Sequence, residues 1–108
     1  GAFHSPFMDE PSTQFSEYLK QIKFKNPSFP VISNYEPSLC SDPNELKIRL
    51  EKQMCNGVRW RETMDLMAKD SDLHIVEIGP SNVLSGLGKR HLKNVKISQV
   101  SSADQITY

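Results

Sequence analysis

The sequence is poor in cysteine, has no excess of either charge and contains no long apolar run. Its 108 residues carry 13 Lys and Arg against 13 Asp and Glu, whereas proteins that bind nucleic acids usually present a positive stripe to the phosphates. No apolar run approaches the roughly 18 residues that cross a membrane. We therefore expect neither a nucleic-acid partner nor a membrane partner. Because no initiating Met is present, we expect the natural N-terminus to lie further upstream.

The two cysteines, Cys40 and Cys55, lie fifteen positions apart and do not form a CxxC pair. His4, His74 and His91 complete no metal-ligand spacing with them. A single disulfide between the two thiols is one alternative. The spacing favours the other, which is two free thiols in a reducing compartment. We expect no metal site and no cofactor.

Two motifs of catalytic loops are also missing. The segment EIGPSNVLSGL, residues 77–87, has glycines but neither G-x-G-x-x-G nor a GK[ST] ending, so we interpret it as a tight turn between a strand and a helix. No G-x-S-x-G occurs anywhere in the chain. The residues that flank Ser5, Ser12, Ser33 and Ser85 are not those of a nucleophile elbow.

The hydrophobic pattern predicts one small α/β domain. Short apolar runs at 30–34, 73–79 and 95–100 predict strands. Between them, helical spacing predicts helices at 9–22, from Pro43 to the Asn56-Gly57 pair, at 59–69 and from Ser81 to His91. This order indicates about three parallel strands with crossover helices. The bare edge of so small a sheet would allow self-association.

Local signals predict how two of these helices begin and end. Ser41 or Asp42 caps the second helix, and Asn56-Gly57 ends it with a residue in the left-handed conformation. Ser81 caps the fourth helix. The residues expected on buried helix faces are Phe15, Tyr18, Leu19, Ile22, Leu46, Leu50, Met54, Trp60, Met64, Met67, Val83, Leu84 and Leu87.

Four motifs stand in a fixed order along the chain. They are GAFHS at 1–5, PVISN at 30–34, LEKQM with VRW at 50–60, and VEIGPSNVLSGLGKR at 76–90. Together they resemble the C-terminal part of the malonyl-coenzyme A:acyl carrier protein transacylases, the malonyltransferases of type II fatty acid synthesis. The resemblance implies that residues 1–100 are a fragment of the larger, α/β-hydrolase-like subdomain of the acyltransferase fold. Residues 101–108 are expected to form a flexible tail.

The resemblance also implies a mechanism, in which malonyl passes from malonyl-CoA to the phosphopantetheine thiol of acyl carrier protein through a seryl ester. His4 matches the general base of the family, and Gln53 matches the residue whose backbone carbonyl orients that base. Phe3 matches the position whose bulk favours malonyl over methylmalonyl. The nucleophile, the oxyanion hole, the carboxylate-binding arginine and the small ferredoxin-like subdomain are expected upstream, so the isolated chain is expected to be inactive.

The chain departs from the family at Gly57, where proline is usual, and at Ser81, where glycine is usual. Three other interpretations stay open. The chain can be the acyltransferase segment of a polyketide or type I fatty acid synthase, or a non-catalytic fragment that binds acidic carrier protein through Lys89 and Arg90. It can also be a truncation product without a role of its own. Bacterial cytoplasm, plastid and mitochondrion all remain candidate compartments.

Overall fold

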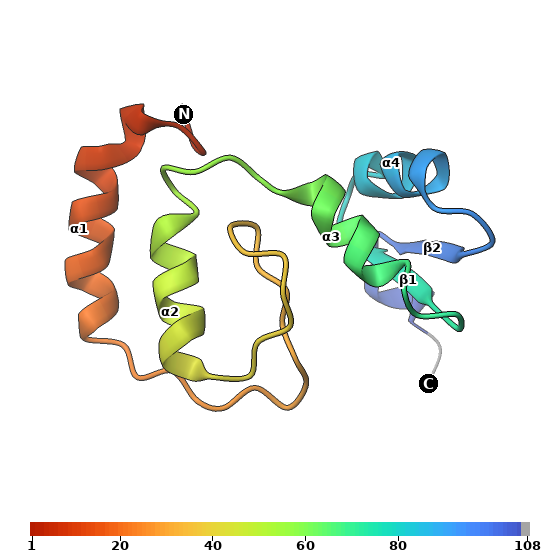
Figure 1. Ribbon diagram of the computed structural model, residues 1–108, viewed down its shortest axis with the longest axis horizontal. Helices are drawn as coiled ribbons and strands as arrows, with labels where there is room; N and C mark the ends of the chain where they lie inside the picture. The colour runs from red at the N-terminus through yellow and green to blue at the C-terminus, as the bar shows by residue number, and fades with distance from the viewer. Residues whose placement is uncertain (107–108) are drawn as a thin grey trace. The chain divides into compact units, whose positions relative to one another are not determined.

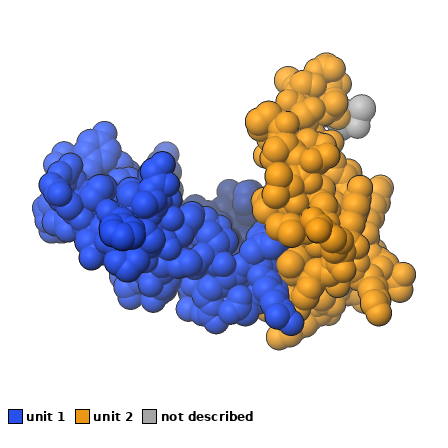
Figure 2. Space-filling view, turned by 90° about the horizontal axis from the view of Figure 1, so that it is seen from above, with its two compact units in different colours: residues 1–63 blue, residues 64–108 orange. Residues whose placement is uncertain are grey.

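The structure, a computed structural model, describes residues 1–106. The chain divides into two compact units, Gly1–Thr63 and Met64–Tyr108, which Figure 2 shows in blue and orange. The first unit contains helices α1, Asp9–Lys20, and α2, Pro43–Lys52, and the boundary falls within α3, Trp60–Met67. None of the helices within the described residues is long and apolar enough to span a membrane.

In the first unit, α1 and α2 pack side by side (Figure 1). A short 3-10 turn, Pro6–Met8, leads into α1. The prediction of a helix from residue 9 is confirmed, although the helix ends two residues early. Of the apolar residues expected on the inner helix faces of this unit, Leu19 and Met54 are buried, whereas Tyr18, Ile22 and Leu50 are exposed.

The strand predicted at 30–34 is wrong. Val31 pairs only with Cys40, in a single antiparallel bridge whose two backbone N–H···O bonds both measure 2.9 Å. The groups that would extend the ladder have other partners, because the Ser38 N–H donates to the carbonyl of Glu36 at 2.9 Å and the Asp42 carbonyl accepts from the N–H of Leu46 at 3.0 Å. The described residues therefore contain two parallel strands rather than about three.

Helix α2 begins as predicted but ends differently. Asp42 is its N-cap, and the Asp42 Oδ1 atom accepts hydrogen bonds from the N–H groups of Asn44, at 2.7 Å, and Glu45, at 3.0 Å. At the other end, Asn56 Nδ2 donates to the carbonyl of Lys52, at 2.7 Å. The expectation of a left-handed residue at Asn56-Gly57 is wrong, because this side chain satisfies a terminal carbonyl that a left-handed residue would otherwise serve.

The second unit is a β–α–β arrangement. Strands β1, His74–Ile78, and β2, Lys96–Val100, pair in parallel, and α4, Val83–His91, is the crossover between them. The predicted α/β class is confirmed by this arrangement. Gly79 ends β1 with a φ of 151°, a value that residues with a side chain rarely adopt. Its N–H donates to the carbonyl of Val100 at 3.0 Å.

A carboxylate, rather than the predicted Ser81, caps α4. Glu77 is buried in β1, and its two oxygens accept from the N–H groups of Leu84, at 3.2 Å, and Ser85, at 2.7 Å. A negative charge suits the positive end of a helix. The Ser85 hydroxyl and these two amides lower the pKa of Glu77 against an opposing effect of burial.

The buried face of α4 also differs from the prediction. Val83 and Leu84 are 62% and 44% exposed, whereas Ser85 and Gly88 are buried. A Cβ atom on Gly88 would lie 2.9 Å from Ile97 Cδ1, so the helix approaches β2 through a residue without a side chain. The closeness of this packing explains why small residues occupy the inner face.

The segment after β2 forms a 3-10 turn at Ala103–Gln105, and the Ser101 N–H donates to Gln105 Oε1 at 2.7 Å. The predicted flexible tail spans 101–108, of which 107–108 lie outside the described residues. Its flexibility stays a prediction.

Candidate active site

The backbone of His4 is fixed in an unusual conformation. Its φ of 65° lies in the left-handed region, which costs a non-glycine residue of order 1–3 kcal/mol and which surrounding contacts must maintain. The His4 N–H donates to the carbonyl of Met54 at 2.8 Å. One residue further on, the Ser5 hydroxyl donates to the carbonyl of Ala2 at 2.6 Å. These bonds hold the loop in which the half-buried imidazole lies.

The imidazole makes a second contact with the same segment, because His4 Nδ1 lies 2.8 Å from the carbonyl oxygen of Gln53. A carbonyl can only accept a hydrogen bond, so Nδ1 carries the proton in the neutral ring. The lone pair is then on Nε2. The structure thus brings together the two residues that sequence analysis named as base and orienter, and their catalytic roles stay predictions.

The end of α2 makes the Gln53 carbonyl available. Gln53 is the C-cap residue, and its N–H donates to the carbonyl of Arg49 at 3.1 Å. The last carbonyls of a helix have no partner one turn further on. The carbonyl of Gln53 therefore accepts from a ring outside the helix without breaking a helical hydrogen bond.

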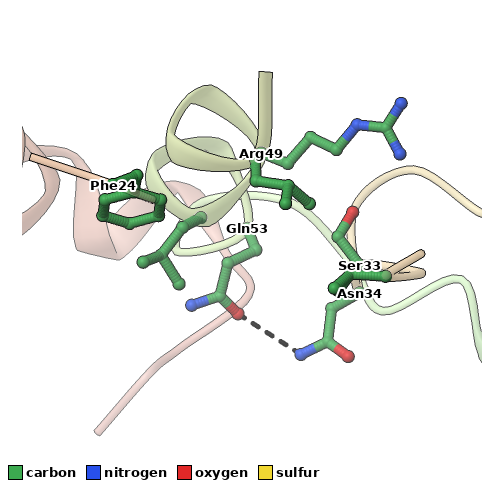
Figure 3. A pocket seen from close by; sticks show the side chains of 8 residues that line it. Phe24, Ser33, Asn34, Arg49 and Gln53 are labelled. Atoms are coloured by element: carbon green, nitrogen blue, oxygen red, sulfur yellow. Dashed lines mark hydrogen bonds between the residues drawn. The ribbon is translucent and has the colours of Figure 1, made fainter. Parts of the chain in front are cut away.

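The side chain of Gln53 has its own partner. Asn34 Nδ2 donates to Gln53 Oε1 at 3.4 Å, and Figure 3 shows the two amide groups facing each other. Both residues line an open pocket of about 430 Å³, whose other walls are Phe24, Val31, Ser33, Leu46, Arg49 and Leu50. Asn34 ends the PVISN motif, but no pattern in the sequence places its side chain against residue 53.

Phe3 lies next to the imidazole. The ring centroids of Phe3 and His4 are 6.5 Å apart, and the ring planes are tilted by 56°. Phe3 is 55% exposed, so in this structure it is not a core aromatic residue. Its place beside His4 agrees with the position of a substrate contact, and that role stays a prediction.

Several other polar groups belong to the second unit or have no catalytic arrangement. His74 Nε2 lies 2.9 Å from Ser98 Oγ, and His91 Nε2 lies 2.6 Å from Asp65 Oδ1. Cys40 and Cys55 are free thiols. Within residues 1–106, no group of three or more His, Cys, Asp or Glu side chains is arranged to hold a metal ion.

Known proteins resemble this chain over nearly its whole length. The malonyl CoA-acyl carrier protein transacylase of Synechocystis is 38% identical over 106 residues, which are 98% of this chain and 36% of that protein. A crystal structure of the Synechocystis transacylase superposes on 96% of the chain with a TM-score of 0.90. The chain is homologous to part of the malonyl CoA-acyl carrier protein transacylases. It spans about a third of the length of the relatives that it matches.

Other transacylases are similar to the same extent of this chain. The transacylase from Staphylococcus aureus is 29% identical to it, over 98% of this chain and 34% of the bacterial protein. The malonyltransferase from Bartonella henselae, known from a crystal structure, is 31% identical; the match covers 94% of this chain and 32% of the malonyltransferase chain, with a TM-score of 0.87. No protein-family model matches the chain. The two-stranded α/β arrangement and its helices therefore resemble part of these solved transacylases.

Proposed function

We propose that this chain supplies the general base of a malonyl transfer from coenzyme A to acyl carrier protein, as the C-terminal part of a transacylase. The observation that carries the proposal is the 2.8 Å contact between His4 Nδ1 and the Gln53 carbonyl. It leaves the Nε2 lone pair of a neutral imidazole free to accept a proton. Homology over nearly the whole chain to malonyl transacylases supports the identity of the acyl group.

The base would act twice. In the first half-reaction, Nε2 removes the proton of a serine hydroxyl as the oxygen attacks the malonyl thioester, and the protonated imidazole then returns that proton to the departing thiolate of coenzyme A. In the second, Nε2 takes the proton of the carrier-protein thiol as the sulfur attacks the seryl ester, and the protonated imidazole returns that proton to the departing serine oxygen. Because no serine here lies in a G-x-S-x-G elbow, another part of the enzyme must supply the nucleophile.

The backbone amide and the ring of His4 bind consecutive carbonyls, those of Met54 and Gln53. This two-point attachment fixes both the position and the rotation of the imidazole. A fixed ring needs no reorganisation when the serine approaches, and a positioned base contributes roughly 10²–10⁴-fold to a rate. The left-handed backbone of His4 is consistent with such a role, since strained residues cluster at active sites.

A second candidate function, binding of the carrier protein alone, has one observation in its favour. Lys89 and Arg90 are exposed in the last turn of α4, and acidic partners are recognised by such cations. A solved relative, 28% identical with a TM-score of 0.86, is a malonyl transacylase in complex with the acyl carrier protein of a type II polyketide synthase. Titration with acyl carrier protein tests this candidate: salt-sensitive binding that Lys89→Glu and Arg90→Glu abolish would support it.

A chimera tests the proposed base function. The matching 106 residues of the Synechocystis transacylase would be replaced by this chain, and transfer of malonyl to carrier protein would be measured. We expect the folded chimera to transfer malonyl and the isolated chain to show no transfer above background. A folded chimera without transfer would contradict the function, and turnover by the isolated chain would contradict the division of roles.

A further inference from the structure

We propose that Asn34 is a positioning residue for His4. The inference rests on the proposed function, since it concerns the same imidazole, but it predicts a property of the ring that can be measured without catalysis. In the first unit, a segment after α2 accepts two hydrogen bonds from His4. Asn34 contacts that segment, and hydrogen bonds hold the loop that contains Asn34.

The two acceptors of His4 lie at the start of one short segment. The carbonyl of Gln53 accepts from the imidazole, and the carbonyl of Met54 accepts from the His4 N–H. Helix α2 ends at Lys52, and these two peptide groups are tied to it by long turn bonds, from the N–H groups of Met54 and Cys55 to the carbonyls of Glu51 and Lys52, each 3.3 Å. Contacts from outside α2 therefore add to the restraint on the segment from 53 to 59.

Asn34 contacts both ends of this segment. At one end, its Nδ2 donates to Gln53 Oε1 at 3.4 Å (Figure 3). At the other end, its backbone carbonyl accepts from the N–H of Arg59 at 3.0 Å. A single residue thus braces the segment at residue 53 and at residue 59, and the acceptors of His4 lie between these points. A displacement of residue 53 that moved its carbonyl away from the imidazole would also move its side chain away from Asn34.

The loop that carries Asn34 is itself tied down. The Glu36 N–H donates to Ser33 Oγ at 3.0 Å, which closes a tight turn around Asn34. Arg49, a buried residue of α2, donates from one guanidinium nitrogen to the carbonyl of Ser38 at 2.9 Å. The Val31–Cys40 bridge closes the base of the same loop. The loop that places Asn34 next to Gln53 is therefore held by backbone hydrogen bonds and by the buried guanidinium of Arg49.

The consequence concerns the tautomer of His4. While the Gln53 carbonyl accepts from Nδ1, the neutral ring keeps its proton on Nδ1 and its lone pair on Nε2. When the Gln53 side chain loses its partner, the peptide group is less restrained and the hydrogen bond to the ring weakens. A larger fraction of the neutral imidazole then carries its proton on Nε2, and that form has no lone pair for a nucleophile at this atom.

Nitrogen-15 NMR of the His4 imidazole in the 108-residue chain reads this tautomer directly. We expect Asn34→Ala to lower the ratio of the Nδ1–H to the Nε2–H form about threefold, the effect of losing one ordinary hydrogen bond. Gln53→Ala keeps the backbone carbonyl and should lower the ratio by a similar factor. The double variant should show no further fall, because both changes remove the same contact.

Asn44→Ala is the matched control, since Asn44 is an exposed asparagine of α2 whose described contact to Asp42 is through its backbone. It should leave the tautomer ratio unchanged. A ratio unchanged in folded Asn34→Ala, or additive effects of the two single variants, would overturn the proposal. A chimera that transfers no malonyl while Asn34→Ala still shifts the tautomer would instead reject the proposed function and leave the positioning role standing.

Discussion

The imidazole of His4 and the backbone carbonyl of Gln53 lie 2.8 Å apart although the two residues are 49 positions apart in the chain. A side-chain carboxylate could also orient a histidine, but it would add a charge that stabilises the protonated ring. A neutral carbonyl fixes the tautomer without that charge. The arrangement therefore fixes which nitrogen of the neutral ring carries the proton.

Replacing Phe3 should widen the range of substrates. In the chimera, Phe3→Ala removes bulk beside the imidazole, and we expect the preference for malonyl-CoA over methylmalonyl-CoA to fall about tenfold, a usual effect of one methyl group in a pocket. Competition between the two thioesters measures the ratio. Phe7→Ala is the control, because Phe7 is a nearby aromatic residue that is 86% exposed. An equal change in both variants would contradict a substrate contact at Phe3.

Removing the cap of α2 should destabilise the first unit. Asp42→Ala leaves two N–H groups at the start of the helix without their acceptor, and we expect the free energy of unfolding to fall by about 0.5–2 kcal/mol. Ser41→Ala should have little effect, because Asp42 rather than Ser41 is the N-cap. Urea denaturation of both variants measures the difference, and equal losses would show that the cap is not the cause.

The charge of Glu77 should make stability depend on pH. Its pKa is lowered in the folded chain, with the Ser85 hydroxyl as the largest cause, so the folded state favours the ionised form. This contribution is present above the ordinary pKa of a glutamate and is lost as the pH falls through the lowered value.

Thermal melting of wild type and Glu77→Gln between pH 7 and pH 3 checks this linkage. The difference in Tm should be largest at pH 7 and shrink toward pH 3, because protonation removes the same charge from the wild type. Asp72→Asn, at an exposed carboxylate of the same unit, should show no such convergence. A Tm difference for Glu77→Gln that is constant with pH would reject the account.

The two glycines of α4 should respond in opposite ways. No atom lies within 4 Å of a Cβ built on Gly86, so Gly86→Ala should stabilise the chain by about 0.5–1 kcal/mol through helix propensity. Gly88→Val would meet the side chain of Ile97 and should cost about 1–3 kcal/mol. Chemical denaturation measures both. A destabilised Gly86→Ala would mean that α4 is held differently.

Local patterns predicted most of the elements, and the failures have physical causes. Helical spacing found α1 to α4, and β-branched runs found β1 and β2. The run at 30–34 is also β-branched, but Ser38 and Asp42, which would extend its pairing, have other hydrogen-bond partners, so it forms only one bridge. Ser81 was a good capping residue by type, yet Glu77 reaches the same amides from the neighbouring strand. Contacts of this kind depend on tertiary packing.

The candidate site likewise combines features that local motifs predicted with features that depend on tertiary packing. The motifs that resemble the transacylases pointed to Phe3, His4 and Gln53, and the structure places these residues near one another. Neither the left-handed backbone of His4 nor the contact between Asn34 and Gln53 has a signal in a single sequence. Each depends on chain segments that meet only in the folded unit.

The most direct test of the central claim compares the chimera with its His4→Ala variant in malonyl transfer to acyl carrier protein. If His4 is the general base, the folded variant should lose about 10²–10⁴-fold in rate, while the exposed His74→Ala control in the other unit keeps the rate of the chimera. A His4→Ala chimera that is folded and transfers malonyl as fast as its parent would contradict the account.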